Sequence, residues 1–227
     1  MDNYLVIGKH SWNRESFNLS PIAKMPNWHY VDDVECLNYE FISHIEPRMI
    51  FVLHWSNLIS PNLISQFQFV IFHMTDLPFG RGGSPLQNLI IRGFNKTVVS
   101  AIRASNQLDA GPIFMKRELS LSGSAQEIYK RASKLSIDMA IEISANNLEP
   151  IPQVGTVTNF LRRLPAESEV NDATTTPQLY DFIRMLDAEG YPRAFFVKLG
   201  FRFEFSEASL IDGSIEARVK IETNPKN

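Results

Sequence analysis

His73 and Asp109 are the residues of this sequence whose types and positions best suit chemistry. His73 directly follows an apolar run, residues 67–72, that is typical of a buried strand. Open α/β sheets bind their ligands at the ends of such strands, so the position of this histidine is informative. Asp109 lies on a glycine-containing turn and could orient the imidazole and stabilise its positive charge. The pair indicates acid–base chemistry in which the histidine moves a proton and the carboxylate assists it.

Both residues lie within longer patterns. The first reads His-x-Thr-x-Leu-Pro-x-x-Arg-Gly-x-x-Pro from His73 to Pro85, and the second reads Leu-Asp-x-Gly-x-Ile from Leu108 to Ile113. Two anchored patterns at this separation are a more specific signal than either alone. Together they resemble the folate-dependent N-formyltransferase family, which includes methionyl-tRNA formyltransferase and the sugar N-formyltransferases of bacterial surface glycans. The resemblance is good over roughly residues 50–150 and weak towards both ends.

The resemblance implies an enzyme that takes a formyl group from 10-formyltetrahydrofolate and uses no metal. In formyl transfer to an amine, the amine loses a proton, an oxyanion is stabilised, and the leaving nitrogen of the folate is protonated. The resemblance assigns the proton transfers to His73, as general base and acid, and assigns the orientation and charging of its ring to Asp109. The structural alternatives are a hydrogen-bonded histidine at a strand end and an aspartate that caps its own turn.

The sequence departs from the family pattern at Ile71. The family has an asparagine two residues before the histidine, where its amide helps to bind the formyl oxygen, and this chain has isoleucine there. Another group must then replace that donor. We expect His54 to do so, because it follows the apolar run 49–53 that should form the neighbouring strand, and Asn57 is the second choice. The alternative for His54 is an imidazole that packs beside Trp55.

The resemblance also implies which residues bind the two substrates. The folate side of the pocket is expected to comprise Leu77, Pro78, Phe79 and Gly80 with Asn106, Gln107 and Leu108. For the last three we expect backbone contacts more than side-chain contacts. The acceptor side is expected to comprise Arg81, Gly82, Gly83 and Ser84, where glycine allows close approach of the backbone. The same stretch can also serve as a flexible start to the helix that follows.

The composition is that of an ordinary soluble globular protein. Of its 227 residues, 44% are hydrophobic and 21% are charged, with a net charge of −3 and a pI near 6.0. This balance argues against a general nucleic-acid binder, which usually presents a basic face. Cys36 is the only cysteine, which excludes an intramolecular disulfide and a cysteine-based zinc site. Because the sequence shows no signal peptide and no apolar run of about 18 residues, we expect a cytoplasmic protein without membrane contact.

The apolar runs predict an α/β fold with a Rossmann-like, mostly parallel sheet and helices on both of its faces. Consecutive apolar residues, in place of alternating ones, indicate strands that are buried on both sides. Such strands are expected at residues 4–8, 29–34, 49–53, 67–72 and 97–102. Capping boxes at residues 84–87 and 124–127 mark two helix starts, and apolar residues from Ile128 to Ile143 then recur at helical spacing.

The chain is expected to divide near a proline-containing linker at residues 149–153. Residues 1–150 would form the formyltransferase catalytic domain, and residues 151–227 would form a small C-terminal α+β extension. In the extension, a helix begins near Thr176 and antiparallel strands follow over residues 194–222. The apolar alternation near the start of those strands makes a homodimer through the tail conceivable.

The acceptor that we expect is the primary amine of a nucleotide-linked amino sugar. Relatives of this size with a short C-terminal extension resemble the surface-glycan enzymes, and so do segments 160–165 and 183–192. A 4-amino-4,6-dideoxy sugar on UDP or dTDP is favoured, and the set includes a precursor of a pseudaminic-type nonulosonic acid. Methionyl-tRNA is disfavoured because the chain is short and acidic, so we expect no nucleic acid as partner.

Two alternatives stay open at this point. One is the formylation of an aminoacyl group that is bound to the carrier of a peptide synthetase, since similar domains serve there. The other is a folate- or nucleotide-binding protein without catalysis, which isoleucine at position 71 would explain. Retention of both the histidine and the aspartate argues against the second alternative.

Overall fold

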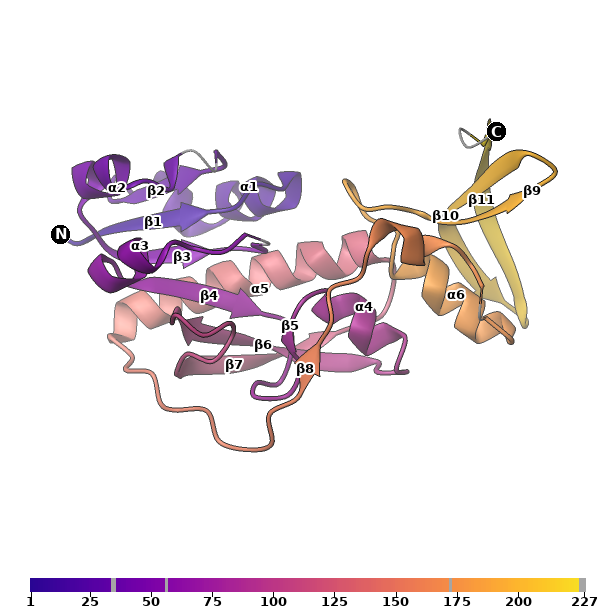
Figure 1. The fold of residues 1–227 in the computed structure, drawn as a ribbon. Helices are drawn as coiled ribbons and strands as arrows, with labels where there is room; N and C mark the ends of the chain where they lie inside the picture. Colours follow the sequence, from indigo (N-terminus) through magenta and orange to yellow (C-terminus); the bar gives the residue numbers. More distant parts are fainter. Residues whose placement is uncertain (34–35, 56, 172, 225–227) are drawn as a thin grey trace. The chain divides into compact units, whose positions relative to one another are not determined.

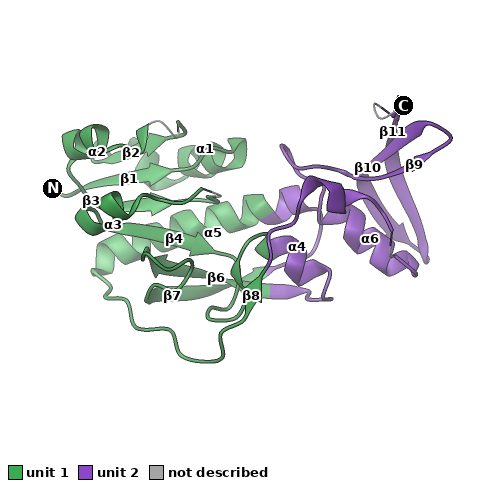
Figure 2. Cartoon of the chain, in the orientation of Figure 1, with its two compact units in different colours: residues 1–85, 97–119, 129–160 green, residues 86–96, 120–128, 161–227 purple. Residues whose placement is uncertain are grey.

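The computed structural model describes residues 1–33, 36–55, 57–171 and 173–224. Their contacts divide the chain into two compact units, each built from three segments (Figure 2). The first unit comprises residues 1–85, 97–119 and 129–160, and the second comprises residues 86–96, 120–128 and 161–227. Each unit is described by itself below.

A mostly parallel sheet forms the centre of the first unit (Figure 1). Among the described residues it has six strands in the order β2-β1-β3-β4-β6-β7. The first four of these strands are parallel to one another, and β6 is antiparallel to β4. The strands are β1 (Asn3–Ile7), β2 (Trp28–Val31), β3 (Pro47–Val52), β4 (Phe69–His73), β6 (Lys96–Arg103) and β7 (Ile113–Ser120).

The central strands are buried on both faces of the sheet. Four consecutive residues of β1 and four of β3 are buried, although successive side chains of a strand point to opposite faces. A cluster on one face joins Leu5, Ile50 and Phe69 from three strands with Ile42 and Leu63 from two helices. The helices of this unit are α1 (Ser11–Asn18), α2 (Tyr39–Ile45), α3 (Pro61–Gln66) and most of α5 (Ala125–Asn146). The predicted mostly parallel α/β sheet is thus confirmed.

Two details of the sheet differ from the sequence-based prediction. The strand expected at residues 29–34 is β2, which begins and ends earlier, and Val34 lies outside the described residues. β7 was not predicted at all. It lies at the end of the strand order and its buried and exposed residues mix, so it lacks the continuous apolar run that marks the central strands.

The second unit contains the predicted antiparallel strands. β9 (Ala194–Lys198), β10 (Phe201–Ile211) and β11 (Ser214–Thr223) form a sheet of three strands within the described part of this unit, in the order β11-β10-β9. Asp212 and Gly213 connect the last two strands with φ angles of 48° and 78°, as a tight hairpin turn requires. The unit also contains α6 (Thr176–Arg184) and, from Leu86 onwards, α4 (Pro85–Ile90). No helix among the described residues is long and apolar enough to cross a membrane.

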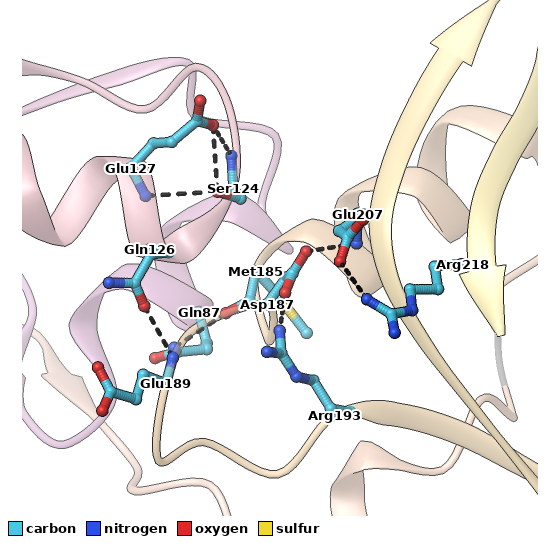
Figure 3. A network of polar contacts seen from close by, with 10 residues as sticks. All are labelled: Gln87, Ser124, Gln126, Glu127, Met185, Asp187, Glu189, Arg193, Glu207 and Arg218. Carbon is cyan, nitrogen blue, oxygen red and sulfur yellow. Dashed lines mark hydrogen bonds and ion pairs between the residues drawn. The ribbon is translucent and has the colours of Figure 1, made fainter. Parts of the chain in front are cut away.

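A network of polar contacts joins distant segments of the second unit (Figure 3). The buried Asp187 forms an ion pair with Arg193 and accepts a hydrogen bond of 2.6 Å from the backbone N–H of Glu207. Gln126 accepts a hydrogen bond of 2.8 Å from the backbone N–H of Glu189. The two hydrogen bonds join residues 20 and 63 positions apart, so they stabilise the tertiary fold of this unit and not one element alone.

The first turn of α5 is closed by the capping box that the sequence predicts (Figure 3). Glu127 accepts hydrogen bonds of 2.8 and 3.1 Å from the backbone N–H and hydroxyl of Ser124, and its own N–H donates to that hydroxyl at 3.3 Å. The box satisfies backbone donors that have no partner within the helix.

We expect Ser124→Ala to lower the free energy of unfolding by about 1 kcal/mol, because the capping hydroxyl is lost. Urea denaturation followed by circular dichroism measures this change. Ser144→Ala in the same helix is the control, since Ser144 lies in the last turn, far from the capping box. Equal stabilities of the two variants would contradict the capping role of Ser124.

A cluster of rings lies beyond the ends of β1 and β3. His10 stacks on the buried Trp12 with ring centroids 4.2 Å apart. His54 packs edge-on against the ring of Tyr129 with centroids 4.1 Å apart. The centroids of His10 and His54 are 4.8 Å apart. Burial lowers the pKa of His54 to about 3, and repulsion from His10 and Lys9 adds to this effect. His54 is therefore neutral in the folded protein at pH 7.

The low pKa of His54 predicts a loss of stability in acid. The unfolded chain binds a proton at this residue below about pH 6.5, whereas the folded protein does so only near pH 3. The stabilisation is therefore complete above about pH 6.5 and is lost as the pH falls towards 3. Between pH 7.5 and 5, His54→Asn should lose less stability than the wild type, by at most about 2 kcal/mol. His44→Asn, on the exposed side of α2, is the control, and its stability should change with pH as that of the wild type does. If the free energy of unfolding had the same slope against pH in all three proteins, the assignment to His54 would be contradicted.

Candidate active site

His73 and Asp109, which the sequence singles out, lie side by side in the first unit. His73 is the last residue of β4, and Asp109 lies between β6 and β7. The distance from His73 Nδ1 to Asp109 Oδ2 is 3.6 Å, and less than a tenth of each side chain is exposed. The antiparallel pairing of β4 with β6, in which His73 lies opposite Ser100, brings the two segments together.

The contacts of His73 define which ring nitrogen carries a proton in the neutral form. Nε2 lies 2.8 Å from the carbonyl oxygen of Gly80. A carbonyl oxygen only accepts, so Nε2 is the donor of this hydrogen bond. Nδ1 is then the nitrogen that can take up a further proton, and it faces the carboxylate of Asp109. A proton at Nδ1 would place a positive charge next to a carboxylate in a largely buried site, which is favourable.

Asp109 is held in a conformation that few residues adopt. Its φ angle is 51°, in the left-handed region that aspartate tolerates better than most other residues. The carboxylate oxygen that faces His73 accepts a hydrogen bond of 2.9 Å from the backbone N–H of Gly82. This bond fixes the carboxylate, so the geometry of the acid–base pair depends on the position of residue 82.

Gly82 belongs to a short two-stranded ladder, in which β5 (Arg81–Gly82) is parallel to β8 (Asn159–Phe160). Its φ angle is 109°, and a Cβ atom would lie 2.3 Å from the carbonyl oxygen of Phe160. Both observations require glycine. Gly80, which supplies the carbonyl to His73, is fixed by Thr158, whose hydroxyl accepts a hydrogen bond of 2.7 Å from its N–H.

Gly111 is required for a similar reason on the other side of the site. A Cβ atom there would lie 1.7 Å from the carbonyl oxygen of Arg103, so the turn that carries Asp109 runs directly against the end of β6. The glycine in the pattern Leu-Asp-x-Gly thus allows the close approach that places the aspartate.

The predicted folate segment from Leu77 to Gly80 adjoins His73 through the Gly80 carbonyl. Leu77 is fully buried, its peptide bond to Pro78 is cis, and its carbonyl oxygen accepts a hydrogen bond of 2.6 Å from Lys116 Nζ. The Phe79 ring packs edge-on against Phe160 with centroids 5.4 Å apart. The loop is therefore anchored from β7 and β8.

The second predicted folate segment, Asn106, Gln107 and Leu108, is exposed directly before Asp109. The Leu108 side chain is 57% exposed, which is unusual for a large apolar residue next to a buried carboxylate. The structure thus presents an accessible apolar side chain and accessible backbone beside the acid–base pair. Both are suited to the flat, partly polar ring system of a pterin.

The predicted acceptor residues Arg81, Gly82, Gly83 and Ser84 follow the loop. The Arg81 guanidinium donates to Gln153 Oε1 from Nη2 at 2.6 Å and from Nε at 3.2 Å. The N–H of Gly83 donates to the Phe160 carbonyl oxygen at 3.2 Å, and Ser84 has a φ angle of 49°. The backbone of this stretch is fixed by hydrogen bonds, in contrast to the flexible helix start that the sequence also allowed.

The third predicted catalytic residue, His54, lies in the ring cluster described above. Its ring contacts include His10, Trp12 and Tyr129, whereas His73 contacts Gly80 and Asp109. Ile71, which stands where the family has asparagine, packs against the core cluster of the sheet. Asn57, the second choice, is exposed.

Three residues that the sequence analysis did not assign to the site hold it together. Gln153 donates to the carbonyl oxygens of Asp109 and Gly111 at 2.8 Å each, in addition to its contact with Arg81. The others are Thr158 and Lys116. Gln153 and Thr158 lie in a connector with little regular structure, and Lys116 lies on the unpredicted β7, so no periodic pattern marked them.

The arrangement is suited to proton transfer at a buried histidine and carboxylate. In the described residues, no group of three or more His, Cys, Asp or Glu side chains could hold a metal ion. The site residues His73, Gly80, Gly82, Asp109 and Gln153 all belong to the first unit.

Comparisons with known proteins show which sequences and folds this chain resembles. The family model for the C-terminal domain of methionyl-tRNA formyltransferase matches residues 165–222. The solved structure of a methionyl-tRNA formyltransferase from Clostridium thermocellum is 42% identical, covers 99% of this chain and 100% of its own, and superimposes with a TM-score of 0.93. A 4-N formyltransferase from Francisella tularensis covers 96% of each chain with a TM-score of 0.64 at 14% identity, which shows a shared fold alone.

A curated relative is similar over part of its length. The methionyl-tRNA formyltransferase of Wolinella succinogenes is 27% identical over 146 residues, which are 62% of this chain and 47% of that protein. The chain thus spans about half the length of this relative, or less in other curated matches.

These findings overturn two predictions. The expected nucleotide-linked amino sugar and the expected absence of a nucleic-acid partner are both wrong, because the relatives with the higher identities carry the name methionyl-tRNA formyltransferase. The expected role in surface-glycan synthesis is likewise unsupported by these relatives. The physical reason is that net charge and chain length describe the whole molecule and do not report which amine a site accepts.

The matched patterns, the paired histidine and aspartate and the 42% identity over the full chain lead to one assignment. The chain belongs to the formyltransferase family.

Proposed function

We propose that this protein transfers a formyl group from 10-formyltetrahydrofolate to the amino group of methionyl-tRNA, in the cytoplasm. The observation that carries the proposal is the 42% identity, over 99% of the chain, to a protein named methionyl-tRNA formyltransferase. It is closer to the alternative of a carrier-bound aminoacyl acceptor than to an amino sugar, with tRNA in place of the peptide synthetase carrier.

His73 and Asp109 would carry the proton transfers of this reaction. Nδ1 of His73 is free of the Gly80 hydrogen bond and can take the proton that the amine loses. Asp109 lies 3.6 Å away and would stabilise the charged ring until the proton moves on to the leaving nitrogen. The hydrogen bond from Gly82 N–H keeps the carboxylate in place during both steps.

The formyl donor would lie beside this pair. Bound 10-formyltetrahydrofolate would supply the formyl group. The exposed Leu108 and the backbone of residues 106–108 would contact its ring system, and the anchored loop from Leu77 to Gly80 would form the opposite wall. Arg81 to Ser84 would border the acceptor through their fixed backbone.

His54 is our proposed replacement for the asparagine of the family. It lies two residues after the end of β3. β3 is the parallel neighbour of β4, which ends at His73. Because His54 is neutral at pH 7, it keeps one N–H that can donate to the formyl oxygen.

We expect His73→Ala and Asp109→Asn each to reduce formyl transfer by about 10²–10⁴-fold, because a general acid–base group or its charge partner is removed. Purified protein is incubated with 10-formyltetrahydrofolate and methionyl-tRNA, and formyl-methionine is measured by mass spectrometry after mild hydrolysis. Exposed His44→Ala is the control and should retain full activity. Circular dichroism should show that all variants remain folded.

The same assay tests the acceptor. Free methionine and uncharged tRNA should give no product, and binding of the folate without transfer to any aminoacyl-tRNA would refute the proposed function. An active His73→Ala variant would refute the mechanism but not the acceptor.

His54→Asn should lower kcat by about 10-fold or more if His54 supplies the missing donor, since loss of one such donor costs this much or more in other enzymes. His44→Asn is again the control. Full activity of His54→Asn would restrict His54 to its role in the ring cluster.

A further inference from the structure

Gln153 has every hydrogen-bonding position of its side chain occupied, although it lies in an irregular connector. Its two amide hydrogens serve the carbonyl oxygens of Asp109 and Gly111, both at 2.8 Å. Its oxygen accepts from Arg81 at 2.6 and 3.2 Å. A side-chain amide has two donors and one acceptor oxygen, and here all of them are used.

The two carbonyls that Gln153 binds flank Ala110 and define the turn that carries the catalytic carboxylate. Asp109 has a φ angle of 51° in this turn, which is an unfavourable conformation that its surroundings must maintain. Gln153 is 44 residues away along the chain and supplies two of the bonds that maintain it. The Arg81 contact joins the same amide to β5, whose Gly82 binds the Asp109 carboxylate.

We infer that Gln153 is a positioning residue for Asp109, and this inference rests on the proposed function. Gln153 binds the backbone carbonyl of Asp109, while the N–H of Gly82 binds its carboxylate. Arg81, the neighbour of Gly82 in β5, donates to Gln153 and so connects the two contacts. Glutamine is required because methionine has no donors and glutamate would direct a carboxylate at two carbonyl oxygens. The role is indirect, since Gln153 acts through Asp109 and not on a substrate.

The 3.6 Å separation of His73 and Asp109 makes the site sensitive to this support. The attraction of the two groups weakens as they separate, and a displacement of about 1 Å can reduce catalysis by about 10²-fold. We therefore expect Gln153→Met to lower kcat for formyl transfer by about 10- to 100-fold with little change in either KM. Gln153→Glu should lose at least as much. Exposed Gln66→Met, whose amide makes a single contact in α3, is the matched control and should behave as the wild type.

A double-mutant cycle separates positioning from a general structural role. In an Asp109→Asn background the assisting charge is already absent, so Gln153→Met should cause little further loss of kcat. Fully additive losses would overturn the inference, because Gln153 would then act independently of Asp109.

A second measurement does not depend on the reaction. Hydrogen exchange of the Gly82 amide reports its bond to the Asp109 carboxylate, and this exchange should increase by about tenfold or more in Gln153→Met. The amides of β6 at Ala101 and Ile102 serve as internal references and should stay protected if the fold is intact. Unchanged exchange at Gly82 would overturn the inference even if the enzyme proves to use another acceptor. Conversely, a wild type that transfers no formyl group would refute the proposed function while this measurement still decides the role of Gln153.

Discussion

The hydrogen bond from the Gly82 backbone to the Asp109 carboxylate is the interaction on which the rest of the site depends. It joins β5 to the turn that follows β6, and the same carboxylate oxygen faces the histidine ring. Gly82 has a φ angle of 109° and lies so close to Phe160 that no side chain would fit, so only glycine can hold this position. A buried charge is costly without such partners, so the backbone around residue 82 and the electrostatics of His73 cannot be separated.

Much of the fold could be predicted because its central strands are buried on both faces. Continuous apolar runs marked β1, β3 and β4, and the Ser124–Glu127 capping box marked the start of α5. The edge strand β7 could not be found in this way, because a strand at the sheet edge does not need an apolar run. The same holds for Gln153 and Thr158: their importance comes from tertiary contacts across the connector, and isolated polar residues in a linker look alike.

The prediction of the acceptor failed for a different physical reason. The residues that move the proton lie in a recurring pattern, whereas the residues that choose among amines need no fixed pattern and are distributed over the surface. Net charge was a poor guide, because five cations of the second unit are already paired: Arg184, Arg193, Arg202, Arg218 and Lys220. A formal charge of −3 therefore says little about the local potential that a tRNA would meet.

The connector after α5 illustrates how a segment without regular structure can still be strictly constrained. Gln153 donates a hydrogen bond to the turn that carries Asp109, and Thr158 accepts one from Gly80. Phe160 pairs with Gly82 in the short ladder. The residues between the first two of these anchors, 154–157, are exposed. Substitutions of these side chains would leave the anchors in place, except at Gly155, whose φ angle of 127° disfavours other residues. Their number is fixed, because one residue more or fewer would shift every later anchor by about 3.3 Å of extended chain. This surface segment therefore sets the spacing between two anchors, and it tolerates most substitutions but no insertion or deletion.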